Sequence, residues 1–200
     1  MRRIWVFAFL LLTVGGYSQK FPSDFWHEGK IILEAGDTLK GNVKYNMQND
    51  VLQFEKNGVL TSFTARKVRF FEIFDLTIKR YRQFYSLPYT TSGEYKAPVF
   101  FELLAEGNLT LLCREAIEYR SNASSNSYYG SSTRLVLVTK FFLFKDNGSI
   151  EPFVGKRSDL VYIAGNKGVL VERYMKANKL SVDNKYQFAQ VVDYYNSLYK

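Results

Sequence analysis

Short runs in which apolar and polar residues alternate, separated by turn-forming residues, extend from residue 29 to about residue 153. In residues 39–45, the side chains of Leu39, Val43 and Tyr45 alternate with polar ones, as in a strand with one buried face. Similar runs follow at 51–55, 59–64, 68–74, 78–87, 99–105, 109–119 and 135–144. Short strands at this spacing predict a mainly β fold, either an antiparallel β-sandwich or a partly open barrel.

Turn-forming residues between these runs predict hairpins. Asn57-Gly58 is a strong hairpin signal because both residues tolerate a positive φ. Ala35, Gly36 and Asp37 separate two strand-like runs, and Asp37 is open to two interpretations, a turn residue or a catalytic carboxylate. The turn is favoured because Gly and Asp both form turns readily.

The periodicity changes after residue 154, where a helical segment is expected. Apolar side chains from Phe188 to Tyr199 recur every three or four residues and form one stripe, and Asp183 is the expected N-cap of that helix. Shorter helices are expected at 159–164, capped by Ser158, and at 169–177. The predicted organisation is a β domain at 19–154 with a helical tail at 155–200 packed on it, which gives an α+β chain.

The first eighteen residues have the features of a secretory signal peptide. Met1-Arg2-Arg3 precede an uncharged run at 4–14, and small residues follow. That run is shorter than the roughly 20 apolar residues of a membrane span. We expect cleavage between Ser18 and Gln19, export to the periplasm or beyond, and no transmembrane segment in the mature chain. A buried N-terminal strand or helix is the alternative.

The positive charge of the chain favours some classes of partner over others. The formal charge of +8 falls to +6 when Arg2 and Arg3 are removed, which favours an anionic envelope polymer, a lipid headgroup or an envelope protein over nucleic acid. The simpler explanation of this positive charge is that it keeps the protein soluble.

The single cysteine, Cys113, allows no internal disulfide and is expected to be a small buried residue of a strand.

The residue types needed for common catalytic chemistry are scarce, so the sequence favours a non-enzymatic protein over an enzyme. The only histidine, His27, lies near the mature N-terminus, and a surface position is favoured over a catalytic one. No metal or cofactor site is predicted, because a zinc ligand set, a glycine-rich phosphate loop and a dinucleotide fingerprint are all missing from the sequence. Hydrolysis by a pair of carboxylates remains an alternative. Glu115 is the weak candidate for the acid of such a pair, because it shares a strand face with apolar residues.

Two stretches have the composition of binding surfaces. One strand interleaves cations and aromatic residues that can stack on sugar rings or hold anions, and its candidate residues are Lys79, Arg80, Tyr81, Arg82 and Tyr85. A solvated edge strand is the alternative. The polar segment 121–132 contains Tyr128 and Tyr129, and is predicted to be either a recognition loop or a disordered hairpin tip.

Several short motifs stand in a fixed order along the chain: GDTLKG at 36–41, VFFELL at 99–104, GNL at 107–109, NKL at 178–180 and YYN at 194–196. In this order the chain resembles a broad group of uncharacterised exported proteins of Bacteroidota-type bacteria. The resemblance implies an envelope location and a β domain with a helical tail. It implies no activity, ligand or catalytic residue.

Three functions follow as hypotheses. The first is a non-enzymatic binding or interaction module of the bacterial envelope. The second is a hydrolase of glycans or other envelope polymers that uses paired carboxylates. The third is a lipid or lipoprotein carrier that uses the cavity of an open barrel.

Overall fold

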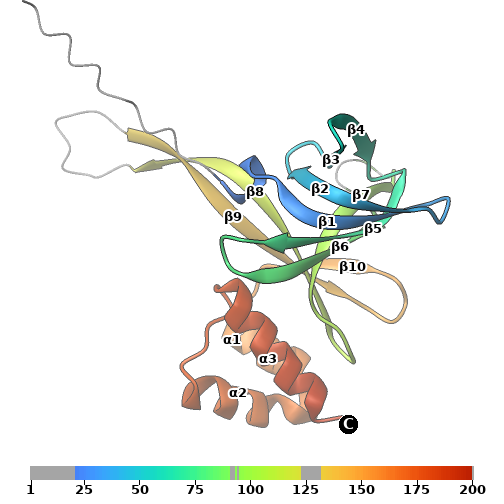
Figure 1. Ribbon diagram of the computed structural model, residues 1–200. Coiled ribbons are helices and arrows are strands. Elements are labelled where there is room, and N and C mark those ends of the chain that lie inside the picture. The colour runs from blue at the N-terminus through green and yellow to red at the C-terminus, as the bar shows by residue number, and fades with distance from the viewer. Residues whose placement is uncertain (1–20, 91–92, 94, 123–131, 200) are drawn as a thin grey trace, which may run out of the picture.

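One large antiparallel sheet and three C-terminal helices make up the computed structural model, which describes residues 21–90, 93, 95–122 and 132–199 (Figure 1). The strands are β1 (His27–Leu33), β2 (Thr38–Asn46), β3 (Val51–Lys56), β4 (Val59–Thr64), β5 (Val68–Asp75), β6 (Arg80–Tyr89), β7 (Ala97–Ala105), β8 (Thr110–Asn122), β9 (Ser132–Phe144) and β10 (Ile150–Phe153). Their order across the sheet is β10-β9-β8-β7-β6-β5-β1-β2-β3-β4, and the sheet is not closed. The prediction of a mainly β, antiparallel fold with a helical C-terminal segment is confirmed.

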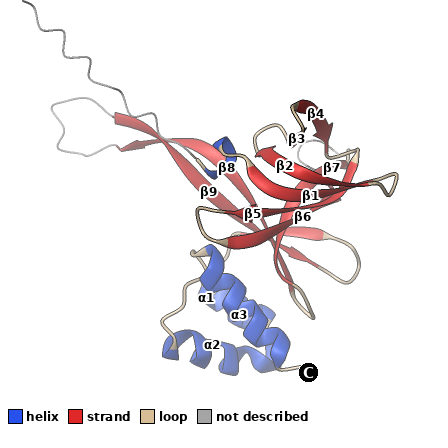
Figure 2. Cartoon of the chain, in the orientation of Figure 1, coloured by secondary structure: helices blue, strands red, loops and turns tan. Residues whose placement is uncertain are grey.

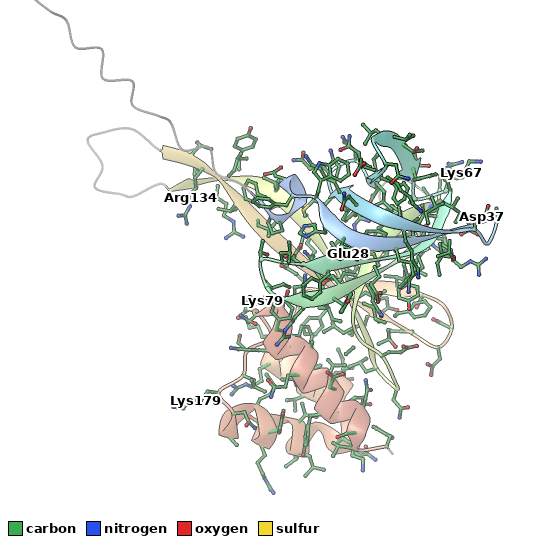
Figure 3. The ribbon with its side chains drawn as sticks, in the orientation of Figure 1. Glu28, Asp37, Lys67, Lys79, Arg134 and Lys179 are labelled. Carbon is green, nitrogen blue, oxygen red and sulfur yellow. The ribbon has the colours of Figure 1, made fainter. Side chains whose placement is uncertain are left out.

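The expected hairpin turns are present. Asn57 and Gly58 have φ values of 53° and 80°, and they connect β3 to β4 in a two-residue turn. The Gly36 N–H donates to the Leu33 carbonyl, which makes the bend between β1 and β2. Asp37 is exposed at the tip of that bend, distant from the helices (Figure 3). The turn interpretation of Asp37 is therefore confirmed.

The sheet splits between β7 and β8. These two strands pair with each other only over residues 102–105 and 111–113, whereas the rest of β7 pairs with β6 and the rest of β8 pairs with β9. The long β8–β9 ribbon consequently projects from the body of the molecule (Figure 1). Asp50 of the β2–β3 turn lies at the split, where it accepts hydrogen bonds from Arg114 at 2.8 and 3.2 Å and from the Phe100 N–H at 3.4 Å.

The strands from β1 to β7 curl around an aromatic core. The ring of Tyr45 on β2 lies 5.3–5.6 Å from the rings of Phe71, Phe84 and Phe100, which come from β5, β6 and β7. Strands that are well separated in the sheet order therefore meet through their inner faces. Burial of these large rings stabilises this half of the sheet.

The helices α1 (Arg157–Ile163), α2 (Gly168–Ala177) and α3 (Lys185–Ser197) gather on one side of the sheet, below it in the view of Figure 2. Phe188, Val191 and Val192 of α3 are fully buried against a second core, together with residues of β8 and β9 such as Leu111 and Phe141. The apolar stripe expected for this helix is thus the face that packs on the sheet. None of the described helices has the length and apolar composition needed to cross a bilayer.

Two predicted helix caps are wrong. Helix α3 is capped by Asn184, whose side chain accepts hydrogen bonds from the backbone of Tyr186 and Gln187, while Asp183 instead accepts a bond from the Ser181 hydroxyl. Helix α1 begins one residue before Ser158, with Lys156 as N-cap. Asn, Asp and Ser are similarly good caps, so composition alone did not distinguish neighbouring positions.

Candidate functional sites

The predicted cation–aromatic row on β6 is divided between the two faces of the sheet. Arg82 shares the inner face with Phe84 and is only 7% exposed, so it is not part of a surface for ligands. Tyr81 is 70% exposed and lies on the opposite, outer face, which Tyr85 shares. Arg80 packs its guanidinium over the ring of Tyr186 in α3, at 5.1 Å. Strand alternation therefore places the members of this row on two faces, and their role in binding stays a prediction.

Lys79 lies in the turn before β6, with a positive φ of 54° and an exposed side chain (Figure 3). Tyr128 and Tyr129 lie outside the described residues, as do Ser18 and Gln19 of the expected cleavage site.

Arg82 belongs to a buried cluster of charges between the sheet and α3. Its guanidinium donates to Glu102 at 2.6 and 3.1 Å, to Glu115 at 2.7 Å and to Asp75 at 3.2 Å. Lys185, the first residue of α3, donates to Glu102 at 2.6 Å and to Glu115 at 2.9 Å. Two cations thus hold three carboxylates, and every one of these side chains is less than a tenth exposed.

The electrostatics of the cluster favour the charged forms of Glu115 and Lys185. Burial alone would raise the pKa of Glu115, but Arg82 and Lys185 outweigh it and hold that pKa below its ordinary value. Burial alone would lower the pKa of the Lys185 ammonium, but the carboxylates of Glu102 and Glu115 outweigh this effect and raise that pKa. Glu115 therefore lacks the raised pKa that a general acid at neutral pH needs, contrary to the expectation from its apolar neighbours.

Cys113 and His27 are both buried. The Cys113 thiol lies 3.6 Å from Glu102, and burial raises its pKa well above the ordinary value, so it is a neutral packing residue as expected. His27 is also buried, and its Nε2 lies 3.1 Å from the Pro22 carbonyl, so the predicted surface position is wrong. The 3-10 turn η1 (Pro22–Asp24), which packs against β2, supplies this carbonyl. Among the described residues no group of three His, Cys, Asp or Glu side chains is arranged to hold a metal ion.

A groove of about 690 Å³ runs across the outer face of β6, β5, β1, β2 and β3. Tyr81 stands at one end of it, with its ring 5.0 Å from that of Phe74. The remaining lining is polar and consists of Glu28, Lys30, Lys40, Asn42, Glu55, Lys56, Asn57 and Glu72, with the backbone of Gly29 and Gly41. Three carboxylates and three ammonium groups give this lining no net formal charge.

Several polar groups of the outer-face groove are held in place by one another. Asn42 donates to Glu55 at 2.8 Å, and the Gly58 N–H donates to the other Glu55 oxygen at 2.8 Å. These hydrogen bonds lower the pKa of Glu55. Lys30 lies 3.6 Å from Glu72. The groove therefore presents fixed hydrogen-bonding groups beside an exposed aromatic ring.

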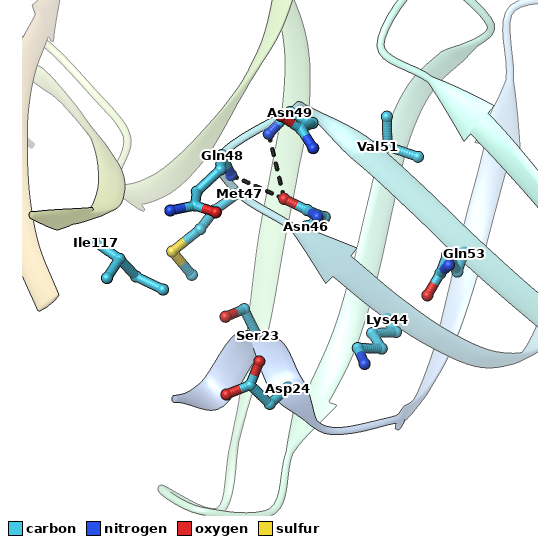
Figure 4. A pocket seen from close by; sticks show the side chains of 10 residues that line it. All are labelled: Ser23, Asp24, Lys44, Asn46, Met47, Gln48, Asn49, Val51, Gln53 and Ile117. Carbon is cyan, nitrogen blue, oxygen red and sulfur yellow. Dashed lines mark hydrogen bonds between the residues drawn. The ribbon is translucent and has the colours of Figure 1, made fainter. Parts of the chain in front are cut away.

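Two other pockets adjoin the charge cluster and the sheet split. One, of about 430 Å³, adjoins the charge cluster between β6, β7 and α3, and its lining includes Arg82, Glu102 and Tyr186. The other, of about 390 Å³, lies at the sheet split between the β2–β3 turn, η1 and Ile117 of β8 (Figure 4). In the second pocket the Asn46 side chain accepts hydrogen bonds from the backbone of Gln48 and Asn49, so it serves the turn itself.

The buried charges could have been found from the sequence by one signal. Arg82 alternates in phase with Phe84, and Glu115 alternates in phase with Cys113, so charges of opposite sign stand on apolar faces of two predicted strands. Buried charges are normally paired, and this pattern indicates an internal ion pair.

Comparisons with protein-family models, with curated proteins and with solved structures found no match for this chain.

Proposed function

We propose that the protein is an exported, non-enzymatic binding module of the bacterial envelope whose outer-face groove holds a neutral glycan. The observation that carries this proposal is Tyr81, an exposed ring placed beside a groove of fixed amide, carboxylate and ammonium groups. A flat ring supports one face of a sugar, and the polar groups hydrogen-bond its hydroxyls. The balanced charge of the lining favours a neutral polymer over the anionic polymer expected from the overall charge.

The other two hypotheses gain no support from a specific contact. Glu102 and Glu115 are both engaged by Arg82 and Lys185, so neither carboxylate is placed as an acid or a nucleophile for hydrolysis. The interior of the curled half is filled by the rings around Tyr45, which leaves that space to side chains rather than to a lipid.

Affinity electrophoresis through gels that contain a soluble polysaccharide tests the proposed ligand class. We expect a neutral β-glucan or mannan to retard the protein, and Tyr81→Ala to weaken the retardation about tenfold or more, as for an anchoring aromatic residue. Tyr119→Ala is the matched control, since Tyr119 is 77% exposed on the projecting ribbon and lies outside the groove. Retardation by a polyuronate alone, or equal effects of the two variants, would contradict the proposal.

Export is the second part of the proposal and rests on the sequence of residues 1–18. The protein recovered from the periplasm or the medium of a bacterial host should begin at Gln19 by N-terminal sequencing. Recovery of the chain in the cytoplasm with residues 1–18 still attached would contradict export.

A further inference from the structure

The two edges of the sheet differ in how they are protected against pairing with another strand. The β10 edge is four residues long, contains Pro152, and carries Glu151 in a 2.6 Å salt bridge with Lys145. Short length, proline and charge are the usual means of blocking an edge. The β4 edge has six residues, with the sequence VLTSFT, and contains neither proline nor charge.

The β4 edge is also regular and open to solvent. Its pairing with β3 runs without a register shift from Val51↔Thr64 to Lys56↔Val59. Val59 is 66% exposed and Leu60 is 59% exposed, and Phe63 alone of the six residues is partly covered. A regular, uncharged and exposed edge of this kind is a template for another strand.

The turn geometry identifies which backbone groups of β4 face outward. A two-residue turn makes Lys56 and Val59 a hydrogen-bonded pair, and hydrogen-bonded and non-hydrogen-bonded pairs then alternate along the hairpin. The N–H and C=O groups of Leu60 and Ser62 therefore point away from β3. The outward carbonyl of Thr64 is already engaged, because it accepts a 2.9 Å hydrogen bond from the Lys67 N–H.

We propose that a second copy of this chain pairs with β4 in antiparallel orientation about Thr61, so that two ten-stranded sheets join into one. In this register Leu60 pairs with Ser62 of the partner, and the reciprocal pair forms on the other side of the two-fold axis. All four intermolecular hydrogen bonds of these pairs use the outward groups of Leu60 and Ser62. A register centred on Ser62 would require the Thr64 carbonyl that Lys67 occupies.

Side chains and charge agree with this register. Val59 comes opposite Phe63 of the partner on one face, which makes two apolar cross-strand pairs in the dimer. No charged side chain stands within the paired segment, although the chain as a whole has a formal charge of +8. The segment thus allows two basic molecules to approach without placing like charges directly opposite each other.

Cysteine crosslinking tests the register. The two Thr61 residues would form a non-hydrogen-bonded pair with Cα atoms about 4.5 Å apart, which is within the range of a disulfide. Thr61→Cys should therefore give a disulfide-linked dimer under mild oxidation, whereas Glu151→Cys on the β10 edge should stay a monomer. The native Cys113 is buried and does not interfere. Absence of the Thr61→Cys dimer, or equal crosslinking of both variants, would overturn the proposal.

The mass of the unlinked protein provides the second test. Light scattering should give twice the monomer mass, falling toward the monomer on dilution. Ser62→Pro removes an outward N–H and no hydrogen bond to β3, so this variant should fold and remain a monomer. A wild-type protein that is monomeric at every concentration, or a Ser62→Pro variant that still forms the dimer, would overturn the proposal.

Discussion

Replacement of Lys185 by methionine should destabilise the protein strongly, because it leaves the buried carboxylates short of one cation. In the folded chain Lys185 contributes one of two positive charges that face Asp75, Glu102 and Glu115, and it contacts both glutamates. Without it, the formal charge of the cluster changes from −1 to −2, since only Arg82 remains. Methionine has a similar length and helix propensity, so the loss isolates the charge.

The size of the effect follows from the burial of the group. Removing one member of a buried ion pair typically costs about 3–5 kcal/mol, since the remaining charge is left in a region of low polarity. The Lys185 side chain is 8% exposed, so little of this cost is screened by solvent. With a urea dependence of about 2 kcal/mol per molar, the midpoint of unfolding should fall by roughly 1.5–2.5 M.

Urea unfolding followed by circular dichroism at neutral pH measures this change, with Lys176→Met as the matched control. Lys176 pairs with Glu172 on the exposed side of α2 and should be replaceable without a measurable shift. In the double variant Lys185→Met/Glu115→Gln, part of the lost stability should return because one unpaired charge is removed. A Lys185→Met protein as stable as the wild type would refute the reasoning, and so would a double variant with purely additive losses.

Three further predictions concern the acid side of the pH profile, the sheet split and the docking of α3. The pKa of Glu115 is lower in the folded protein than its ordinary value of 4.5. Its ionised carboxylate therefore contributes fully to the free energy of unfolding above pH 4.5, and this contribution is lost as the pH falls through the lower folded-state pKa. Glu115→Gln should accordingly flatten the loss of unfolding free energy below about pH 4.5 in acid titrations. Asp50→Asn retains a residue that tolerates positive φ but weakens the bonds to Arg114, and should lower the free energy of unfolding by about 1–3 kcal/mol in urea. Asn196→Ala removes two 2.9 Å hydrogen bonds to the backbone of Leu109, and hydrogen exchange should show faster opening of α3 from the sheet.

The parts of the fold that local sequence determines were predictable. The Asn57-Gly58 turn and the apolar stripe of α3 depend on residues that are neighbours in the chain. The position of Arg82 was not predictable in the same way, because it depends on partners 20 and 33 residues later in β7 and β8 and on Lys185 at the start of α3. A cation on a strand predicts exposure unless the acids that will surround it are also known.

The outer-face groove was not predicted from the sequence, for a related reason. Of the candidate residues on β6 only Tyr81 lines it, and the rest of the lining comes from β1, β2, β3 and β5, whose order in the sheet differs from their order in the chain. Insertion of β1 between β5 and β2 brings Glu28 and Lys30 close to Tyr81. No local pattern indicates that insertion, and the groove exists only because of it.

The buried charges contact two of the apolar cores, since the Arg82 guanidinium lies 5.2 Å from the Phe84 ring in one and Glu102 lies 3.6 Å from the Cys113 thiol in the other. One core lies inside the curled strands around Tyr45, and the other lies between the helices and β8–β10. Both cores are apolar, and apolar surfaces alone would let α3 slide along the sheet with little change in energy. The contacts of Lys185 with Glu102 and Glu115 can form in only one position of α3, because each of these charges loses its partner when the helix moves. On this argument the cluster selects one docking position of the helices. The Lys185→Met/Glu115→Gln variant should then keep its helices while losing the sharp near-ultraviolet signal of a single packed arrangement.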